Sequence, residues 1–196
     1  LGEYLLFYIA IYGQLDGFGP VDVSMYVSDT MENGVKNLQK NMESRYNNSD
    51  FLQKYIPTAK FNQAEMLFTN AAGKSSYVKM FGASTGIRGF KYFGKRPQLA
   101  LFDDLLSDKN AKSEGILEDI ENMVYKGVVP ALDITHKKII FSGTPFNAGD
   151  PLYKAVESAA WVSNVYPIAE EWPCTREEFK GAWPERFSYD ALMSDW

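Results

Sequence analysis

The stretch QLALFDD, residues 98–104, decides the fold. Its apolar run follows Pro97 without interruption, which is typical of a central strand that is buried on both faces of a sheet. The run ends abruptly in two carboxylates, Asp103 and Asp104. A similar run, KIIF at residues 138–141, ends in Ser142-Gly143-Thr144. Such strands alternating with helices predict an α/β fold, a mainly parallel sheet and a ligand site at the carboxyl ends of its strands.

The rest of the chain continues this alternation up to about residue 160, after which the pattern weakens. Asp29, with Glu32 three residues later, is expected to cap a polar helix that follows a strand. The helices we expect are residues 1–12 (mostly buried), about 29–45, 50–55, about 113–126 and 151–158, with short ones near Arg176 and Tyr189; the other strands are residues 21–27, 65–69 and 76–82.

Composition excludes several classes of protein. The chain has 196 residues, 45% of them hydrophobic and 23% charged, which is an ordinary globular mixture. A net charge of −5 gives no global basic field, so any nucleic-acid contact must come from a local patch or from oligomerisation. Cys174 and His136 are the single residues of their types, which excludes an internal disulfide, a zinc cluster and a Ser-His or Cys-His dyad. The longest apolar stretch, residues 4–12, is too short to span a bilayer and has no leader character, so we expect an intracellular protein.

The two carboxylates after the apolar run have the pattern of a Walker B element. Asp103 would hold the water shell of a magnesium ion, and Asp104 would orient or deprotonate the attacking water. The alternative is a helix cap or a turn. The hydroxyls of Ser142-Gly143-Thr144 could sense the γ-phosphate, although the same residues also favour a turn before Pro145. In register with the carboxylates on a parallel sheet, the functional interpretation is the better one.

Gly73-Lys74-Ser75 imitates a phosphate-binding P-loop but lacks its context. A P-loop needs a glycine five residues before Gly73, where this chain has Phe68, and a helix after Ser75, where this chain continues as a strand. We therefore predict a hairpin turn at residues 70–74.

Residues 82–89, GASTGIRG, form a loop of small residues that carries Arg88 and is followed by three more basic residues. An arginine between glycines can reach phosphate oxygens, either as an arginine finger or on a DNA backbone. A solvated basic loop is the alternative.

Taken in order, GASTGIRG (82–89), RPQLALFDD (96–104) and IIFSGTP (139–145) resemble the ATPase domain of the large terminase subunit, the motor that packages DNA into viral capsids. The resemblance implies a RecA-like (ASCE) P-loop NTPase core over residues 1–170, with residues 171–196 as its C-terminal extension. By it, ATP and Mg²⁺ are the cofactors. Asp103 would bind magnesium, Asp104 would be the catalytic carboxylate and Arg88 a finger acting across subunits. Ser142-Gly143-Thr144 would be the nucleotide-contacting motif that couples hydrolysis to DNA movement.

The same resemblance implies double-stranded DNA, the portal protein and the small terminase subunit as partners, in a ring of identical subunits on the procapsid in the host cytoplasm. Residues 1–12 are similar to the helix that follows Walker A, so the P-loop and its strand are expected just before residue 1. The chain departs from the family in having Asp104 where a glutamate is usual.

Two other functions remain open from the sequence. A DNA helicase shares the strand-carboxylate element and a Ser/Thr-containing third motif on a RecA-like core. A degenerate ATPase-like module that binds a partner without hydrolysing ATP is the other alternative.

Overall fold

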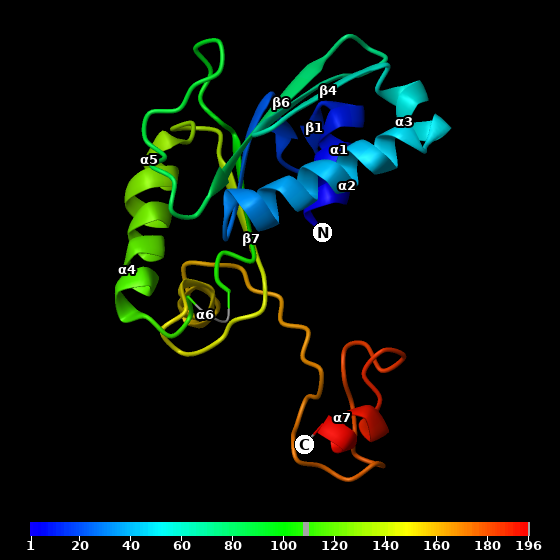
Figure 1. The fold of residues 1–196 in the computed structure, drawn as a ribbon, viewed down its shortest axis with the longest axis vertical. Coiled ribbons are helices and arrows are strands. Elements are labelled where there is room, and N and C mark those ends of the chain that lie inside the picture. Colours follow the sequence, from blue (N-terminus) through cyan, green and yellow to red (C-terminus); the bar gives the residue numbers. More distant parts are fainter. Residues whose placement is uncertain (108–109, 196) are drawn as a thin grey trace. The chain divides into compact units, whose positions relative to one another are not determined.

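The computed structural model describes residues 1–107 and 110–195, so the last residue of the predicted 171–196 extension lies outside the described residues. The chain divides into two compact units, Leu1–Lys154 and Ala155–Trp196. The expected boundary at residue 170 falls inside the second unit. The first unit has the α/β fold that the sequence predicts (Figure 1).

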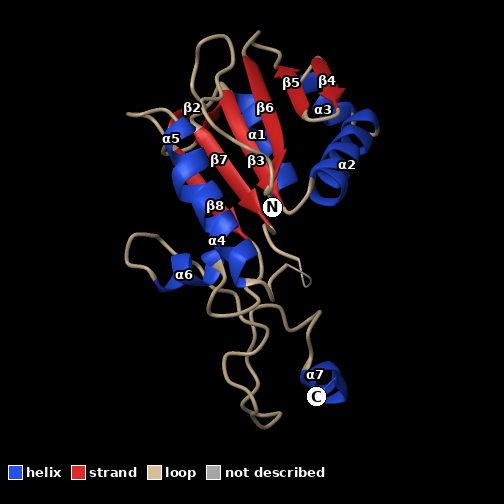
Figure 2. Cartoon of the chain, turned by 60° about the vertical axis from the view of Figure 1, so that its left-hand side comes forward, coloured by secondary structure: helices blue, strands red, loops and turns tan. Residues whose placement is uncertain are grey.

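A six-stranded sheet forms the centre of the first unit, in the order β4-β5-β6-β3-β7-β8. The neighbouring strands from β6 to β8 are parallel, so their carboxyl ends lie at one edge (Figure 2). The prediction of a mainly parallel sheet is therefore confirmed. The strands are β3 (Val23–Ser28), β4 (Thr58–Asn62), β5 (Glu65–Thr69), β6 (Ser75–Gly82), β7 (Leu99–Asp103) and β8 (Lys138–Ser142).

Strands β3 and β7 are central because both of their faces are apolar and covered. Every residue of β3 is buried, as are the four apolar residues of β7. Tyr26 and Leu101 pack into the core on the side of α1 (Gly2–Tyr12) and α2 (Lys36–Asn47). Val27 and Phe102 pack on the opposite side, beneath α4 (Glu114–Asn122) (Figure 1). The period of two along a strand sends alternate side chains to the two faces.

The helices match the expected segments with several corrections. Helix α1 is buried on one side only, because Tyr4, Tyr8 and Tyr12 are exposed. The segment around Arg176 contains turns and no helix. The remaining helical segments are η1 (Met31–Val35, π-helical), α3 (Asp50–Tyr55), η2 (Met123–Val128, π-helical), α5 (Val129–Ala131), α6 (Pro151–Glu157) and α7 (Tyr189–Asp195).

The cap that begins the helical segment after β3 differs from the prediction. Thr30, not Asp29, is the N-cap, and its side chain accepts the N–H of Asn33 at 3.1 Å. The Asp29 carboxylate instead accepts the N–H groups of Thr30 and Gly34. Asp29 therefore still satisfies backbone donors of the first turn, but from one residue earlier than a normal cap.

The predicted hairpin at residues 70–74 is confirmed, and the P-loop interpretation of Gly73-Lys74-Ser75 is excluded. Strands β5 and β6 pair antiparallel on either side of the turn. Asn70 Oδ1 accepts the N–H groups of Ala72 and Lys74, and Gly73 has a φ of +77°. Strand β4, which the sequence analysis missed, adds antiparallel to β5 with every second residue exposed. A two-residue ribbon, β1 (Gln14–Leu15) with β2 (Gly19–Pro20), follows α1.

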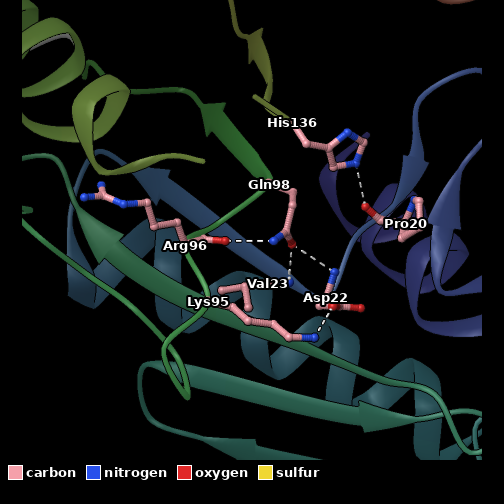
Figure 3. A network of polar contacts seen from close by, with 7 residues as sticks. All are labelled: Pro20, Asp22, Val23, Lys95, Arg96, Gln98 and His136. Carbon is pink, nitrogen blue, oxygen red and sulfur yellow. Dashed lines mark hydrogen bonds and ion pairs between the residues drawn. The ribbon is translucent and has the colours of Figure 1, made fainter. Parts of the chain in front are cut away.

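At the amino edge of the parallel strands, one glutamine joins the segment before β7 to the start of β3. Gln98 Oε1 accepts the N–H groups of Asp22 and Val23 at 3.0 and 2.9 Å, and its Nε2 donates to the carbonyl of Arg96 at 2.8 Å (Figure 3). Nearby, His136 hydrogen-bonds the carbonyl of Pro20. At this edge, these backbone groups therefore have hydrogen-bond partners within the protein.

The second unit is mostly irregular. Arg176 forms an ion pair with Asp190 on α7. The ring of Tyr189 contacts those of Trp172 and Phe179. In the described part of the chain, none of the helices combines the length and hydropathy needed to traverse a bilayer.

Candidate active site

The parallel register brings the predicted strand-end residues together. Asp103, the last residue of β7, lies opposite Ser142, the last residue of β8. Ser28, the last residue of β3, lies opposite Gly82 at the end of β6. Because β3 and β7 are neighbours, these ends line one continuous edge of the sheet. The edge is where ligands bind in open α/β sheets.

Both oxygens of the Asp103 carboxylate accept hydrogen bonds from neighbouring strands. The Ser142 hydroxyl donates to Oδ1 at 2.7 Å, and the Tyr26 hydroxyl donates to Oδ2 at 3.1 Å. Burial, with the nearby Asp103 charge, raises the pKa of Tyr26 well above its usual range. Tyr26 therefore remains a donor at neutral pH, and the Asp103 carboxylate is held in one orientation.

The sequence analysis did not find Tyr26. A hydroxyl in a buried strand does not single it out, because Ser24 and Ser28 of β3 are buried as well. The partner, Asp103, lies 77 residues away, and only the pairing of β3 with β7 brings the two side chains together.

Asp104 has an unusual backbone and an unusual electrostatic setting. Its φ is +45°, and its N–H donates to the carbonyl of Ser142 at 3.1 Å. Burial raises the pKa of the Asp104 carboxyl, and the charges of Asp103 and Asp29 raise it further, while a backbone bond from Thr144 opposes them. A carboxylate with a raised pKa is a stronger base, which suits proton abstraction near neutral pH.

Each residue of Ser142-Gly143-Thr144 either donates a hydrogen bond to one of the two carboxylates or lies very close to it. Ser142 donates to Asp103, and the Thr144 backbone donates to Asp104. Gly143 has a φ of +154°, and a Cβ at this position would lie 3.0 Å from Asp104 Oδ1. Glycine is required here because the loop passes so close to the carboxylate.

The first turn of α1 also reaches this edge. A Cβ on Gly2 would lie 3.4 Å from Asp103 Oδ2. Helix N-termini present free N–H groups and favour anions. A cavity of about 330 Å³ lies here; its lining includes Gly2, Tyr26, Gly34, Asn41, Arg45 and Asp103.

A larger groove of about 960 Å³ lies among α1, α2 and α3 and does not include the carboxylates of the sheet edge. The two hollows share Glu3, Tyr4, Asn41 and Arg45 in their linings. Asp103 lines the smaller of these two cavities, whereas Asp104 lines a separate small hollow together with Ser142, Gly143 and Thr144.

Arg88 is the one predicted site residue that the structure does not bring to the carboxylates. It lies in the loop after β6 with an exposed side chain, and within the described part of the chain no hydrogen bond or ion pair holds it. The preceding Ile87 is buried in the same core cluster as Val124 of η2.

The side-chain atoms at the site that could bind a metal ion are all oxygens, which are the ligands that magnesium prefers. Among residues 1–107 and 110–195, no group of three or more His, Cys, Asp or Glu side chains could hold a metal ion. Magnesium needs fewer protein ligands, because it keeps several waters and takes others from nucleotide phosphates. Asp103, with the adjacent Ser142 hydroxyl, is the pair of side chains that would hold it.

No model of a known protein family matches this chain, and no curated protein matches it either.

Proposed function

We propose that this chain is part of the ATPase core of a viral terminase large subunit, which powers movement of double-stranded DNA into procapsids. The observation that carries the proposal is the contact of both carboxylates at the end of β7 with Ser142-Gly143-Thr144 at the end of β8. In a turn or a helix cap, a carboxylate accepts backbone N–H groups of its own segment. Here the carboxylates at the end of β7 accept hydrogen bonds from residues at the end of β8.

Asp103 and Asp104 have different roles in this proposal. Ser142 and Tyr26 hold the Asp103 carboxylate, which would bind magnesium. Bound Mg²⁺ would neutralise charge on the ATP phosphates. Asp104 orients the attacking water and accepts its proton, for which the raised pKa of its carboxyl is suited.

The phosphates would be bound where α1 begins. Within the described residues β8 pairs only with β7, and its Ile139, Ile140 and Phe141 are apolar yet only partly buried. A further parallel strand added there would end at the edge where the first turn of α1 lies beside Asp103. We propose that the strand and P-loop of the RecA-like core occupy this place, joined to α1.

The partners follow from the resemblance in the same way. Double-stranded DNA, the portal protein and the small terminase subunit are the partners we propose, with a ring of subunits at the procapsid portal in the host cytoplasm. A ring gives Arg88 a role, because its exposed guanidinium could complete the site of a neighbouring subunit.

The test of the carboxylates uses the full-length protein. Asp104→Asn should abolish ATP hydrolysis but leave nucleotide binding near normal, whereas Asp103→Ala should also weaken magnesium-dependent binding. Asn tolerates the positive φ of Asp104, so the backbone is kept. Asp133→Asn, a carboxylate at the opposite edge, is the matched control. Normal turnover by Asp104→Asn would disprove the assignment.

Arg88 is tested by mixing subunits. Arg88→Ala and Asp104→Asn should each be inactive alone, and a mixture should recover hydrolysis because some interfaces pair an intact arginine with an intact carboxylate. An arginine on the transferring phosphate contributes about 10³–10⁵ in rate. Normal hydrolysis by Arg88→Ala, or no recovery in assembled mixed rings, would remove Arg88 from the site.

A further inference from the structure

The loop between β6 and β7 contains a tight turn whose tip is a phenylalanine. Tyr92 and Lys95 exchange two backbone hydrogen bonds, each of 3.0 Å. Between them, Phe93 has a φ of +46° and Gly94 a φ of +80°. Two consecutive positive φ angles in a two-residue connection are those of a type I′ turn. We call residues 92–95 the aromatic turn.

Phe93 is an unfavourable residue for this position in two respects. Asn, Asp and Gly are preferred at the first central position, because a large side chain is strained at positive φ. Phe93 is also 89% exposed, and its ring meets that of Tyr92 edge to face with centroids 4.6 Å apart, so burial returns little stability. Strained, exposed residues of this kind are found at binding sites, where the strain is part of the function.

The aromatic turn is held firmly at its base. The ring of Tyr92 stacks on that of Tyr77, with centroids 3.7 Å apart and planes 8° apart. Tyr77 itself donates to Glu65 at 2.6 Å, and Lys95 pairs with Asp22 at 2.5 Å. Phe93 is therefore presented to solvent from a fixed platform at the amino edge of the sheet.

The surrounding sequence carries basic residues in an acidic chain, although Lys79 and Lys95 form ion pairs with Glu65 and Asp22. From Glu65 to Asp103 there is no acidic residue between the two ends, although the whole chain has a net charge of −5. Lys91, next to the aromatic turn, is exposed, and no side-chain partner holds it within the described part of the chain. The basic residues of this stretch are Lys74, Lys79, Arg88, Lys91, Lys95 and Arg96.

We propose that the aromatic turn and Lys91 form a nucleic-acid contact. Lysine side chains would meet backbone phosphates, and the Phe93 ring would stack on a base or wedge between base pairs. An exposed lysine beside an exposed aromatic ring favours nucleic acid over an acidic protein surface, which needs no protruding ring. The choice of duplex DNA as the first probe rests on the proposed function, but the contact needs neither ATP nor the carboxylates.

The decisive variant is Phe93→Asn. It creates Asn-Gly, the preferred pair for a type I′ turn, so the melting temperature should stay the same or rise. Affinity for a short labelled DNA duplex, measured by fluorescence anisotropy without ATP, should fall about tenfold through loss of the ring. Phe51→Asn is the matched control, because Phe51 is 58% exposed but lies on α3, outside the basic stretch. That variant should bind as the wild type does.

Lys91→Ala tests the phosphate contact. It should weaken binding and reduce the slope of log affinity against log salt by about 1. Lys60→Ala, an exposed lysine on β4, should leave the slope unchanged.

Three outcomes decide the proposal. Loss of affinity in Phe93→Asn with a single strand of the same length as well as with duplex supports it and indicates stacking on bases. Unchanged affinity of Phe93→Asn for both probes overturns it. Tighter, Phe93-dependent binding to poly-glutamate than to DNA also overturns it, in favour of a protein contact. Because no nucleotide is present, failure of the ATPase assignment would leave this assay unaffected.

Discussion

At the two edges of the same sheet, carboxyl groups have pKa values that are shifted in opposite directions. At the carboxyl edge, burial and the charges of Asp103 and Asp29 raise the pKa of Asp104. At the amino edge, the backbone N–H groups of His136 and Thr135 donate to Asp133 and lower its pKa. One edge gathers like charges around Asp104, and the other supplies backbone donors to Asp133.

This difference suggests that the carboxyl edge serves function and the amino edge serves stability. A group of acidic side chains at strand ends costs folding energy and persists where the charges have a task. Hydrogen bonds such as those of Gln98 connect loops and hold the strands in register. We therefore expect the two edges to respond differently to the same kinds of substitution.

The largest effect is expected where the carboxyl edge is built by close backbone approach. A Cβ on Gly34 would lie 2.0 Å from Ser28 Oγ, so Gly34→Ala should destabilise the fold by about 3 kcal/mol through overpacking. Gly115→Ala is the control: nothing lies within 4 Å of its Cβ position on α4, and the variant should be up to about 1 kcal/mol more stable. Urea unfolding measures both. Equal stabilities would show that η1 can move away from β3.

At the amino edge, Gln98→Leu should cost about 2 kcal/mol, because the N–H groups of Asp22 and Val23 lose their acceptor. Gln53 is a matched residue with two hydrogen bonds, to Tyr46 and Asn47, in an exposed setting. Gln53→Leu should cost less than about 0.5 kcal/mol, since water replaces those bonds. A small loss for Gln98→Leu in denaturant unfolding would mean that water also reaches the amino edge.

Two tyrosines sharpen the comparison, because each donates to a carboxylate. Tyr26→Phe and Tyr77→Phe remove donors to Asp103 and Glu65 and should each cost about 1 kcal/mol. In the full-length protein, Tyr26→Phe alone should lower ATP turnover and raise the magnesium concentration needed for half-maximal rate. The same change in magnesium dependence for Tyr77→Phe would assign the effect to stability.

The smallest expected changes are pH-dependent and opposite in sign. Because the pKa of Asp104 is raised on folding, the folded state holds more protons, and stability falls as pH rises through that pKa. Asp104→Asn should therefore be more stable than the wild type at neutral pH. The pKa of Asp133 is lowered, so its contribution is present at neutral pH and lost as pH falls through the lowered value. Asp133→Asn should be less stable at neutral pH.

The measurement is urea unfolding at about pH 7 and about pH 3, on either side of the ordinary aspartate pKa. Both differences from the wild type should shrink at the lower pH. Differences of the same sign at neutral pH would show that the two edges are electrostatically alike.

The sequence by itself determined the elements whose signal is local. Apolar runs at residues 99–102 and 138–141 predict buried strands. The prediction is confirmed for β7 but wrong for β8, which pairs only with β7 within the described residues and is at most partly buried. Their final residues had to meet once the strands were parallel, so Asp103 and Ser142 could be placed at one edge. The hairpin at residues 70–74 was also predictable, since Phe68 stands where a P-loop needs glycine.

Only the tertiary structure decided which strands pair, which distant residues meet and where there is no room for a side chain. Strand β4 was missed because its alternating exposure gives a short, mixed pattern that resembles a loop. The bond from Tyr26 to Asp103 joins residues far apart in sequence, and the requirement for Gly34 comes from Ser28 on another element. The strained φ of Phe93 likewise follows from the turn that Tyr92 and Lys95 close. Local propensity describes what a segment can form, whereas packing fixes which distant groups it meets.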